Sequence, residues 1–161
     1  MLNMFANIYL ISILNFYNVY NRATADEELM ANEEFCLQSD SHVDLIPNWD
    51  MAVMNMWGMV QNEYAVLSTQ PTATSLLGKN VHDRWEVAHQ CSFEWRNVDG
   101  LLTNKEGGEV SSAINLDKPL LSPTWTSKFS FSKCHAHKKT PEDPSLMRVD
   151  RGVSDIVKYA R

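Results

Sequence analysis

The chain has 161 residues, of which 44% are hydrophobic and 21% are charged, and its formal net charge is −6. This length suits a single domain, and this composition is that of a globular protein rather than a disordered chain. Because the net charge is negative and the sequence has no basic run, we expect no nucleic acid partner. If an acidic protein binds a phosphorylated ligand, a cation is needed between the ligand and the protein, so residues that can bind a metal are of interest.

Residues 1–20 form a long apolar run, MLNMFANIYLISILNFYNVY. Its length favours a membrane span or a signal anchor. No Lys or Arg precedes the run and no small-residue cleavage site follows it. In addition, four asparagines fall on one face of a helix drawn through it, namely Asn3, Asn7, Asn15 and Asn18. The sequence therefore leaves two interpretations open, a membrane-anchoring segment and an amphipathic helix packed on the domain.

After Arg22 the sequence alternates between helix and strand patterns. Thr24 and Glu27 have the spacing of a capping box at the start of a helix, and FCLQSD, residues 35–40, predicts a central strand. Asn48 is the predicted N-cap of the next helix, and EYAVLST, residues 63–69, predicts a second strand. The apolar stripe of that helix comprises Trp49, Val53, Met56, Trp57 and Val60. This alternation predicts an α/β fold with a mostly parallel sheet and flanking helices.

The second half of the chain has weaker patterns. Residues 72–110 carry the Gly, Asn and Ser of surface connections, with one short strand predicted in QCSFEW, residues 90–95. Alternating Phe129 and Phe131 predict a later strand, and residues 147–161 predict a short helix. The three cysteines are Cys36, Cys91 and Cys134, and no two of them form a CxxC pair. Because their number is odd, one stays unpaired if two form a disulfide, and the redox compartment stays open.

Asp40 and His42 are the best-placed residues for chemistry, because they follow directly on a predicted strand. Open α/β sheets bind their ligands at the carboxyl ends of the strands. A carboxylate oxygen and a neutral imidazole nitrogen are both ligands for cations such as Mn²⁺, so the Asp-x-His pattern indicates half of a divalent-metal site. The alternative is an ordinary polar turn, in which Asp and Ser satisfy backbone groups where the strand ends.

The segment KCHAHKK offers two candidates for a third metal ligand, His135 and His137. Both follow a predicted strand, so they can lie at the same sheet edge as Asp40. The competing interpretation is a solvated, mildly basic turn. A Cys134–His135 nucleophile is less favoured, because adjacent strand residues point to opposite faces.

Several segments in order along the chain resemble the glycosyltransferase (GlcNAc) family of polypeptide GlcNAc transferases. They are CLQSDSH, PNWD, YAVLST, KPLLSPTWTSKFSFSKCHA and TPEDP, and together they cover roughly residues 22 to 146. The resemblance implies a partial GT-A-type sheet domain that binds a UDP-sugar through a divalent cation. Asp-Ser-His takes the place of the acidic metal-holding triplet of that fold. By the same analogy, Trp125 and the turn at Asp143 line the sugar or acceptor pocket.

The resemblance thus implies Mn²⁺ or Mg²⁺ as cofactor, UDP-GlcNAc as donor and a polypeptide hydroxyl as acceptor. Asp40 and His42 are the expected residues that bind the metal and the nucleotide-sugar. His135 is the expected third metal ligand, because it directly follows the FSFSK stretch that the resemblance covers. No residue is singled out as a catalytic acid or base.

The chain also departs from the family pattern. Family members begin with a nucleotide-binding strand and helix, for which the run of residues 1–20 is too short, so we expect the first nucleotide-binding strand to be lacking. Gly152-Val153-Ser154 stands where the family has Gly-Glu-Glu. These departures suggest an alternative to the enzyme, a non-catalytic fragment or a degenerate copy of a glycosyltransferase.

The expected organisation is an apolar N-terminal segment over residues 1–21, serving as a signal anchor or packed helix, and a partial glycosyltransferase domain over residues 22–161. The expected partners are the nucleotide-sugar donor, the polypeptide acceptor and, through residues 1–20, a membrane. The cytoplasm and a Golgi-type membrane both remain open as locations.

Overall fold

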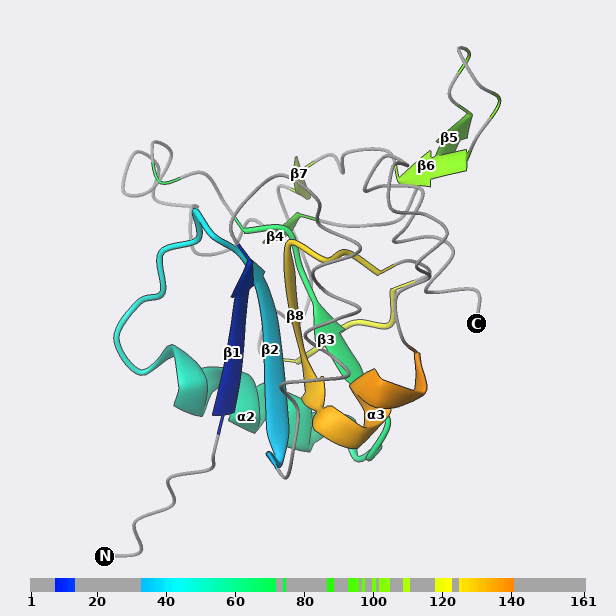
Figure 1. Cartoon of the computed structure of the whole chain (residues 1–161). Helices are drawn as coiled ribbons and strands as arrows, with labels where there is room; N and C mark the ends of the chain where they lie inside the picture. The colour runs from blue at the N-terminus through cyan, green and yellow to red at the C-terminus, as the bar shows by residue number, and fades with distance from the viewer. Residues whose placement is uncertain are drawn as a thin grey trace, which may run out of the picture.

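The fold is an α/β arrangement, seen in a computed structural model (Figure 1). The residues that the structure describes are 8–13, 33–71, 74, 87–88, 93–95, 97, 100, 102–104, 109–110, 118–122 and 125–140. The two helices described are α2 (Trp49–Val60) and α3 (Cys134–Lys139). The main strands are β1 (Ile8–Ile13), β2 (Phe35–Asp40), β3 (Val66–Ser68) and β8 (Phe129–Lys133). Four short strands form two separate pairs: β4 (Val87–Ala88) with β7 (Glu109–Val110), and β5 (Phe93–Trp95) with β6 (Leu102–Asn104).

The main sheet has the strand order β1-β2-β8-β3. β1 and β2 are parallel, whereas β8 is antiparallel to both of its neighbours, β2 and β3. The prediction of an α/β fold is therefore confirmed, but the prediction of a mostly parallel GT-A-type sheet is not. β2 and β3 do run in the same direction, as the helix–strand alternation indicated. They are not neighbours, because β8 from the far end of the chain lies between them.

The apolar face of this sheet holds the core. Phe35, Leu37 and Phe131 are buried there, and the rings of Phe35 and Phe131 stack with centroids 5.2 Å apart. Helix α2 covers this face, and the ring of Trp57 meets Phe35 edge-on at 5.2 Å. The helix residues packed against the core are Trp49, Val53, Met54 and Trp57.

Helix α2 departs from its prediction in two respects. Asn48 does stand at its N-cap, but its backbone has a φ of 63° and its side chain makes no capping hydrogen bond. Asn tolerates this left-handed conformation better than most residues. Of the predicted apolar stripe, Met56 and Val60 are exposed, while Met54 takes part in the packing instead.

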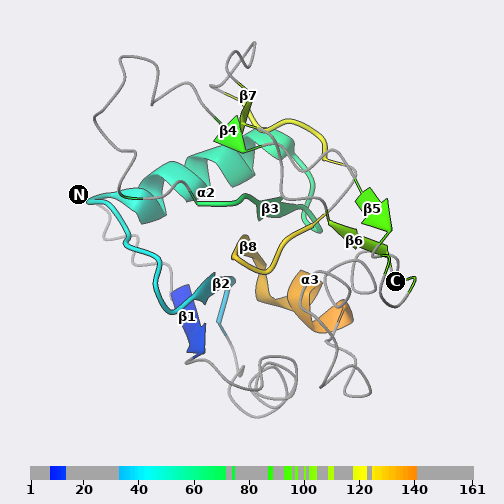
Figure 2. The ribbon, with the colours of Figure 1, turned by 90° about the horizontal axis from the view of Figure 1, so that it is seen from above.

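The opposite face of the sheet is polar and carries α3, and Figure 2 shows α2 and α3 on opposite sides of the sheet. Side chains alternate along a strand, so Cys36, Gln38 and Asp40 point away from the α2 face. Their register partners on β8 are Ser132 for Cys36 and Ser130 for Gln38. A disulfide between Cys36 and Cys134 joins this face of β2 to the start of α3. The segment KCHAHKK, for which a solvated turn was the competing interpretation, instead continues from β8 into a short helix over Cys134–Lys139.

The N-terminal run also differs from its prediction. Ile8–Ile13 forms strand β1, parallel to β2 with Ile13 opposite Asp40, where an amphipathic helix was one of the two interpretations. β-Branched and aromatic residues favour strands, and the segment IYLISI is rich in them. The structure thus has a strand of the main sheet before β2, in the run judged too short to supply the nucleotide-binding half of the fold. Within the part of the chain that the structure describes, no helix is both long and apolar enough to cross a membrane.

The later predictions have mixed outcomes. The strands predicted around residues 63–69, 90–95 and 129–131 are confirmed as β3, β5 and β8. β4, β6 and β7 occur where only surface connections were predicted. The capping-box helix at Thr24, the four asparagines, Asp143 and the predicted helix of residues 147–161 lie outside the described residues.

Candidate functional site

The candidate site lies at the carboxyl end of β2, where Asp40 is the last strand residue. Asp40 is buried, with 9% of its surface exposed. The side chain of His42 is open to solvent, and its Nε2 lies 3.9 Å from Oδ2 of Asp40. The structure thus brings together the two residues that the sequence analysis selected first.

The backbone around Asp40 is held on both sides. Its N–H donates to the carbonyl of Lys128 at 3.2 Å, and its own carbonyl accepts from the N–H of Val43 at 3.3 Å. The hydroxyl of Ser39 donates to the same carbonyl at 3.1 Å. Because backbone groups on either side of the Asp40 side chain are fixed, the carboxylate starts from a well-defined position, as a preorganised ligand requires.

The donor set of Asp40 and His42 fits a divalent cation. Carboxylate oxygen and imidazole nitrogen suit Mn²⁺-like ions. In an octahedral shell with metal–ligand distances of about 2.1 Å, neighbouring ligands lie about 3.0 Å apart and opposite ligands about 4.2 Å apart. The observed 3.9 Å between Nε2 of His42 and Oδ2 of Asp40 is longer than the spacing of neighbouring ligands, so the exposed His42 side chain would move closer to Asp40 to share an ion with it. Among the described residues, no group of three His, Cys, Asp or Glu side chains is placed to hold a metal ion. A cation at Asp40 would therefore need further ligands from phosphate oxygens and water.

His135 does not lie near Asp40. β8 runs antiparallel to β2, so Lys133 at the end of β8 pairs with Phe35 at the start of β2. α3 follows Lys133. His135 and His137 therefore lie near the first residue of β2, whereas Asp40 is its last residue. The selection of His135 as third metal ligand rested on β8 ending at the same edge as β2, and the direction of β8 makes it wrong.

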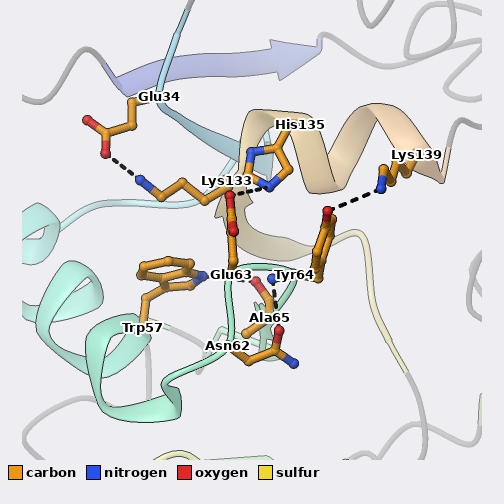
Figure 3. Close-up of polar contacts among 9 residues, drawn as sticks. All are labelled: Glu34, Trp57, Asn62, Glu63, Tyr64, Ala65, Lys133, His135 and Lys139. Carbon is orange, nitrogen blue, oxygen red and sulfur yellow. Dashed lines mark hydrogen bonds and ion pairs between the residues drawn. The ribbon is translucent and has the colours of Figure 1, made fainter.

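The surroundings of His135 are those of a surface contact between α3 and the α2–β3 connection (Figure 3). Its Nε2 lies 3.3 Å from Oε1 of Glu63, and its ring meets the ring of Tyr64 edge-on at 5.3 Å. Lys139 donates to the Tyr64 hydroxyl at 3.2 Å. His137, by contrast, is buried in α3, with 5% of its surface exposed.

The structure also decides the role of Cys134. Its sulfur is bonded to Cys36, and both cysteines are buried at 3% exposure. A disulfide sulfur is not a thiolate, and only the thiolate is a nucleophile. The Cys134–His135 nucleophile is thus excluded in this structure, and Cys91 lies outside the described residues.

Sequence reasoning missed a hydrogen-bonded group beside Asp40. Ser68, the last residue of β3, makes two hydrogen bonds with the backbone of Thr126, at 2.9 and 3.0 Å. Trp125, predicted to line a pocket, is buried and donates its indole N–H to Ser130 at 2.9 Å. The signal in the sequence was the cluster of hydroxyl residues at two strand ends, LST and TWTS, but nothing local indicated that they meet.

The protein is an α/β domain with a carboxylate and an imidazole at the carboxyl end of one strand. The carboxyl ends of strands are where open α/β sheets commonly bind their ligands. Comparison with known families is more specific. The family model described as Glycosyltransferase (GlcNAc) matches residues 19–153, which is most of the chain. The protein therefore belongs to the glycosyltransferase (GlcNAc) family. No curated protein and no solved structure matches the chain.

Proposed function

We propose that this protein transfers GlcNAc from UDP-GlcNAc to a hydroxyl group of a polypeptide, with a divalent cation bound at Asp40 and His42. Membership of the glycosyltransferase (GlcNAc) family supports a sugar donor and an acceptor. The observation that carries the site is the 3.9 Å approach of the Asp40 carboxylate and the His42 imidazole at the carboxyl end of β2.

The reaction breaks the bond between the anomeric carbon of GlcNAc and a phosphate oxygen of UDP. A new bond forms between that carbon and the acceptor oxygen, and the acceptor hydroxyl loses its proton. Negative charge develops on the departing diphosphate, and a bound Mn²⁺ or Mg²⁺ supplies the positive charge that stabilises it. The residues that the structure describes do not single out the base that takes the proton.

Asp40 and His42 have different parts in this proposal. Asp40 has a buried carboxylate on a fixed backbone, so it would hold the cation in one position against the sheet edge. The imidazole of His42 is solvent-exposed, so it would be the second protein ligand of a cation that also contacts the diphosphate. Ions such as Mg²⁺ are commonly bound by one or two protein side chains together with substrate phosphates and water. Two protein ligands are therefore sufficient when nucleotide and metal bind together.

Calorimetry with Mn²⁺ and UDP tests the site. We expect UDP to bind in the presence of Mn²⁺ and to lose its affinity when EDTA is added. Asp40→Asn keeps the shape of the side chain but removes its charge. Loss of a residue that only supports a ligand costs about 10- to 100-fold, so we expect this loss of a direct ligand to weaken binding by more than that. His135→Ala is the matched control, since it removes an imidazole at the opposite end of β2 and should leave the affinity unchanged. Equal affinity of Asp40→Asn and wild type would refute the proposed site.

Transfer assays test the donor and the acceptor. Radiolabelled UDP-GlcNAc, UDP-GalNAc and UDP-glucose are compared with Mn²⁺ and Ser- or Thr-containing peptides. We expect label to enter the peptides from UDP-GlcNAc and to depend on Asp40. Transfer only to free sugars would contradict the polypeptide acceptor, and absence of both transfer and Mn²⁺–UDP binding would contradict the enzymatic function as a whole.

A further inference from the structure

A chain of hydrogen bonds links the end of β3 to Asp40 at the end of β2. It begins at Ser68, whose hydroxyl accepts from the N–H of Thr126 at 2.9 Å and donates to the carbonyl of Thr126 at 3.0 Å. One side chain thus satisfies both backbone groups of a residue 58 positions away in the sequence. Thr126 is itself buried, so these backbone groups have little access to water as an alternative partner.

The chain continues through the turn that precedes β8. Oγ1 of Thr126 accepts from the N–H of Lys128 at 3.3 Å, and Ser127 between them is fully buried. The turn is also held from its other side, because Trp125 donates to Ser130 at 2.9 Å. The conformation of residues 125–128 is therefore set by internal contacts. Ser68 attaches it to β3, next to the hydrogen bond that the N–H of Thr69 donates to the carbonyl of Phe129 at 3.1 Å.

The last step reaches the candidate metal ligand. The carbonyl of Lys128 accepts from the N–H of Asp40 at 3.2 Å. This bond continues the antiparallel register, in which Ser39 is opposite Phe129. The backbone position from which the Asp40 carboxylate extends thus depends on the turn, and the turn depends on Ser68.

We propose that Ser68 is a positioning residue for Asp40, acting through Thr126 and Lys128. The part of the proposal that concerns metal and nucleotide rests on the proposed function above. Residues that support a metal ligand without touching the ion commonly change metal affinity by about 10- to 100-fold when they are removed. Because Ser68 acts through two intervening residues, we expect the lower end of this range.

Amide hydrogen exchange in the metal-free protein tests the positioning itself. Ser68→Ala is expected to raise exchange at the Asp40 N–H about tenfold, while the N–H of Leu37 in the middle of β2 stays within about twofold of wild type. Ser68→Thr keeps the hydroxyl and should restore protection at Asp40. Ser132→Ala is the matched control. Ser132 is a buried serine of β8 on the same face of the sheet as Ser68, with Cys36 and Val66 as its register partners. Unchanged protection of Asp40 in Ser68→Ala, or an equal loss in Ser132→Ala, would overturn the proposal.

Binding of Mn²⁺ with UDP, followed by the paramagnetic resonance signal of Mn²⁺, tests the consequence. We expect Ser68→Ala to weaken Mn²⁺ binding about tenfold, and Ser68→Thr and Ser132→Ala to remain near wild type. If Ser68→Ala does not fold, Thr126→Val decides, because it removes the Oγ1 acceptor for Lys128 and should expose the Asp40 N–H in the same way. If the wild-type protein binds no Mn²⁺–UDP, the proposed function fails, and the exchange experiment still decides whether Ser68 positions Asp40.

Discussion

Loss of the Cys36–Cys134 disulfide is predicted to destabilise the fold strongly. The two cysteines are 98 residues apart in the sequence, so the bond closes a long loop in the unfolded chain. The chain-entropy relation gives about 4.7 kcal/mol at 25 °C for a loop of this length, and engineered bridges often deliver less. This is a large part of the stability of a typical domain, which is about 5–15 kcal/mol. We therefore expect the variant without the bridge to be near the limit of stable folding.

The assay is urea unfolding of the oxidised wild type, the reduced wild type and the double variant Cys36→Ala with Cys134→Ala. Alanine avoids placing new hydroxyl groups in a buried position. We expect the reduced protein and the double variant to unfold at similar, much lower urea concentrations than the oxidised wild type. A difference below about 1 kcal/mol between oxidised wild type and double variant would refute this reasoning, because the loop entropy alone exceeds that value.

Two further predictions concern the sheet and the surface contact at α3. Phe131→Ala removes a fully buried ring that stacks on Phe35. We expect the free energy of unfolding, measured by urea titration, to fall by about 3–5 kcal/mol. A loss below about 1 kcal/mol would contradict the placement of Phe131 in the core. The exposed side chains of Glu63 and His135 are in contact, with Oε1 and Nε2 3.3 Å apart. A double-mutant cycle with Glu63→Gln and His135→Ala should give a coupling of less than about 1 kcal/mol, and a larger coupling would contradict its assignment as a surface contact.

Strands β2, β3, β5 and β8 could be predicted from local sequence, whereas β1, β4, β6 and β7 were missed. The order and direction of the strands could not be predicted. FCLQSD and the alternating phenylalanines of FSFSK correspond to β2 and β8. Nothing within either segment specifies that β8 lies between β2 and β3 or that it runs antiparallel to them. This one fact overturns the prediction of His135 as a metal ligand, because it places His135 away from Asp40. It also brings Lys128, which no prediction included, opposite Asp40.

Asp40 and His42 were found because both belong to one short segment, so their proximity depends on local geometry alone. Ser68 was not found, because its part depends on a contact across 58 residues. The short helix α3 was also missed. Its six residues give too short a pattern to recognise, and the burial of Cys134 and His137 within it is a tertiary effect.

The register between β2 and β8 is the feature on which the site depends. A shift by one residue would move Phe129 and Phe131 to the polar face, which the apolar core under α2 forbids. A shift by two residues would keep every side chain on its own face, so the core alone does not exclude it. The disulfide from Cys36 does exclude it, because it fixes the start of α3 beside the start of β2. At the other end of β8, Ser68 with Thr126 fixes the turn against β3. Because Asp40 lies opposite that turn, the contacts that hold the register also set the position of the proposed metal ligand.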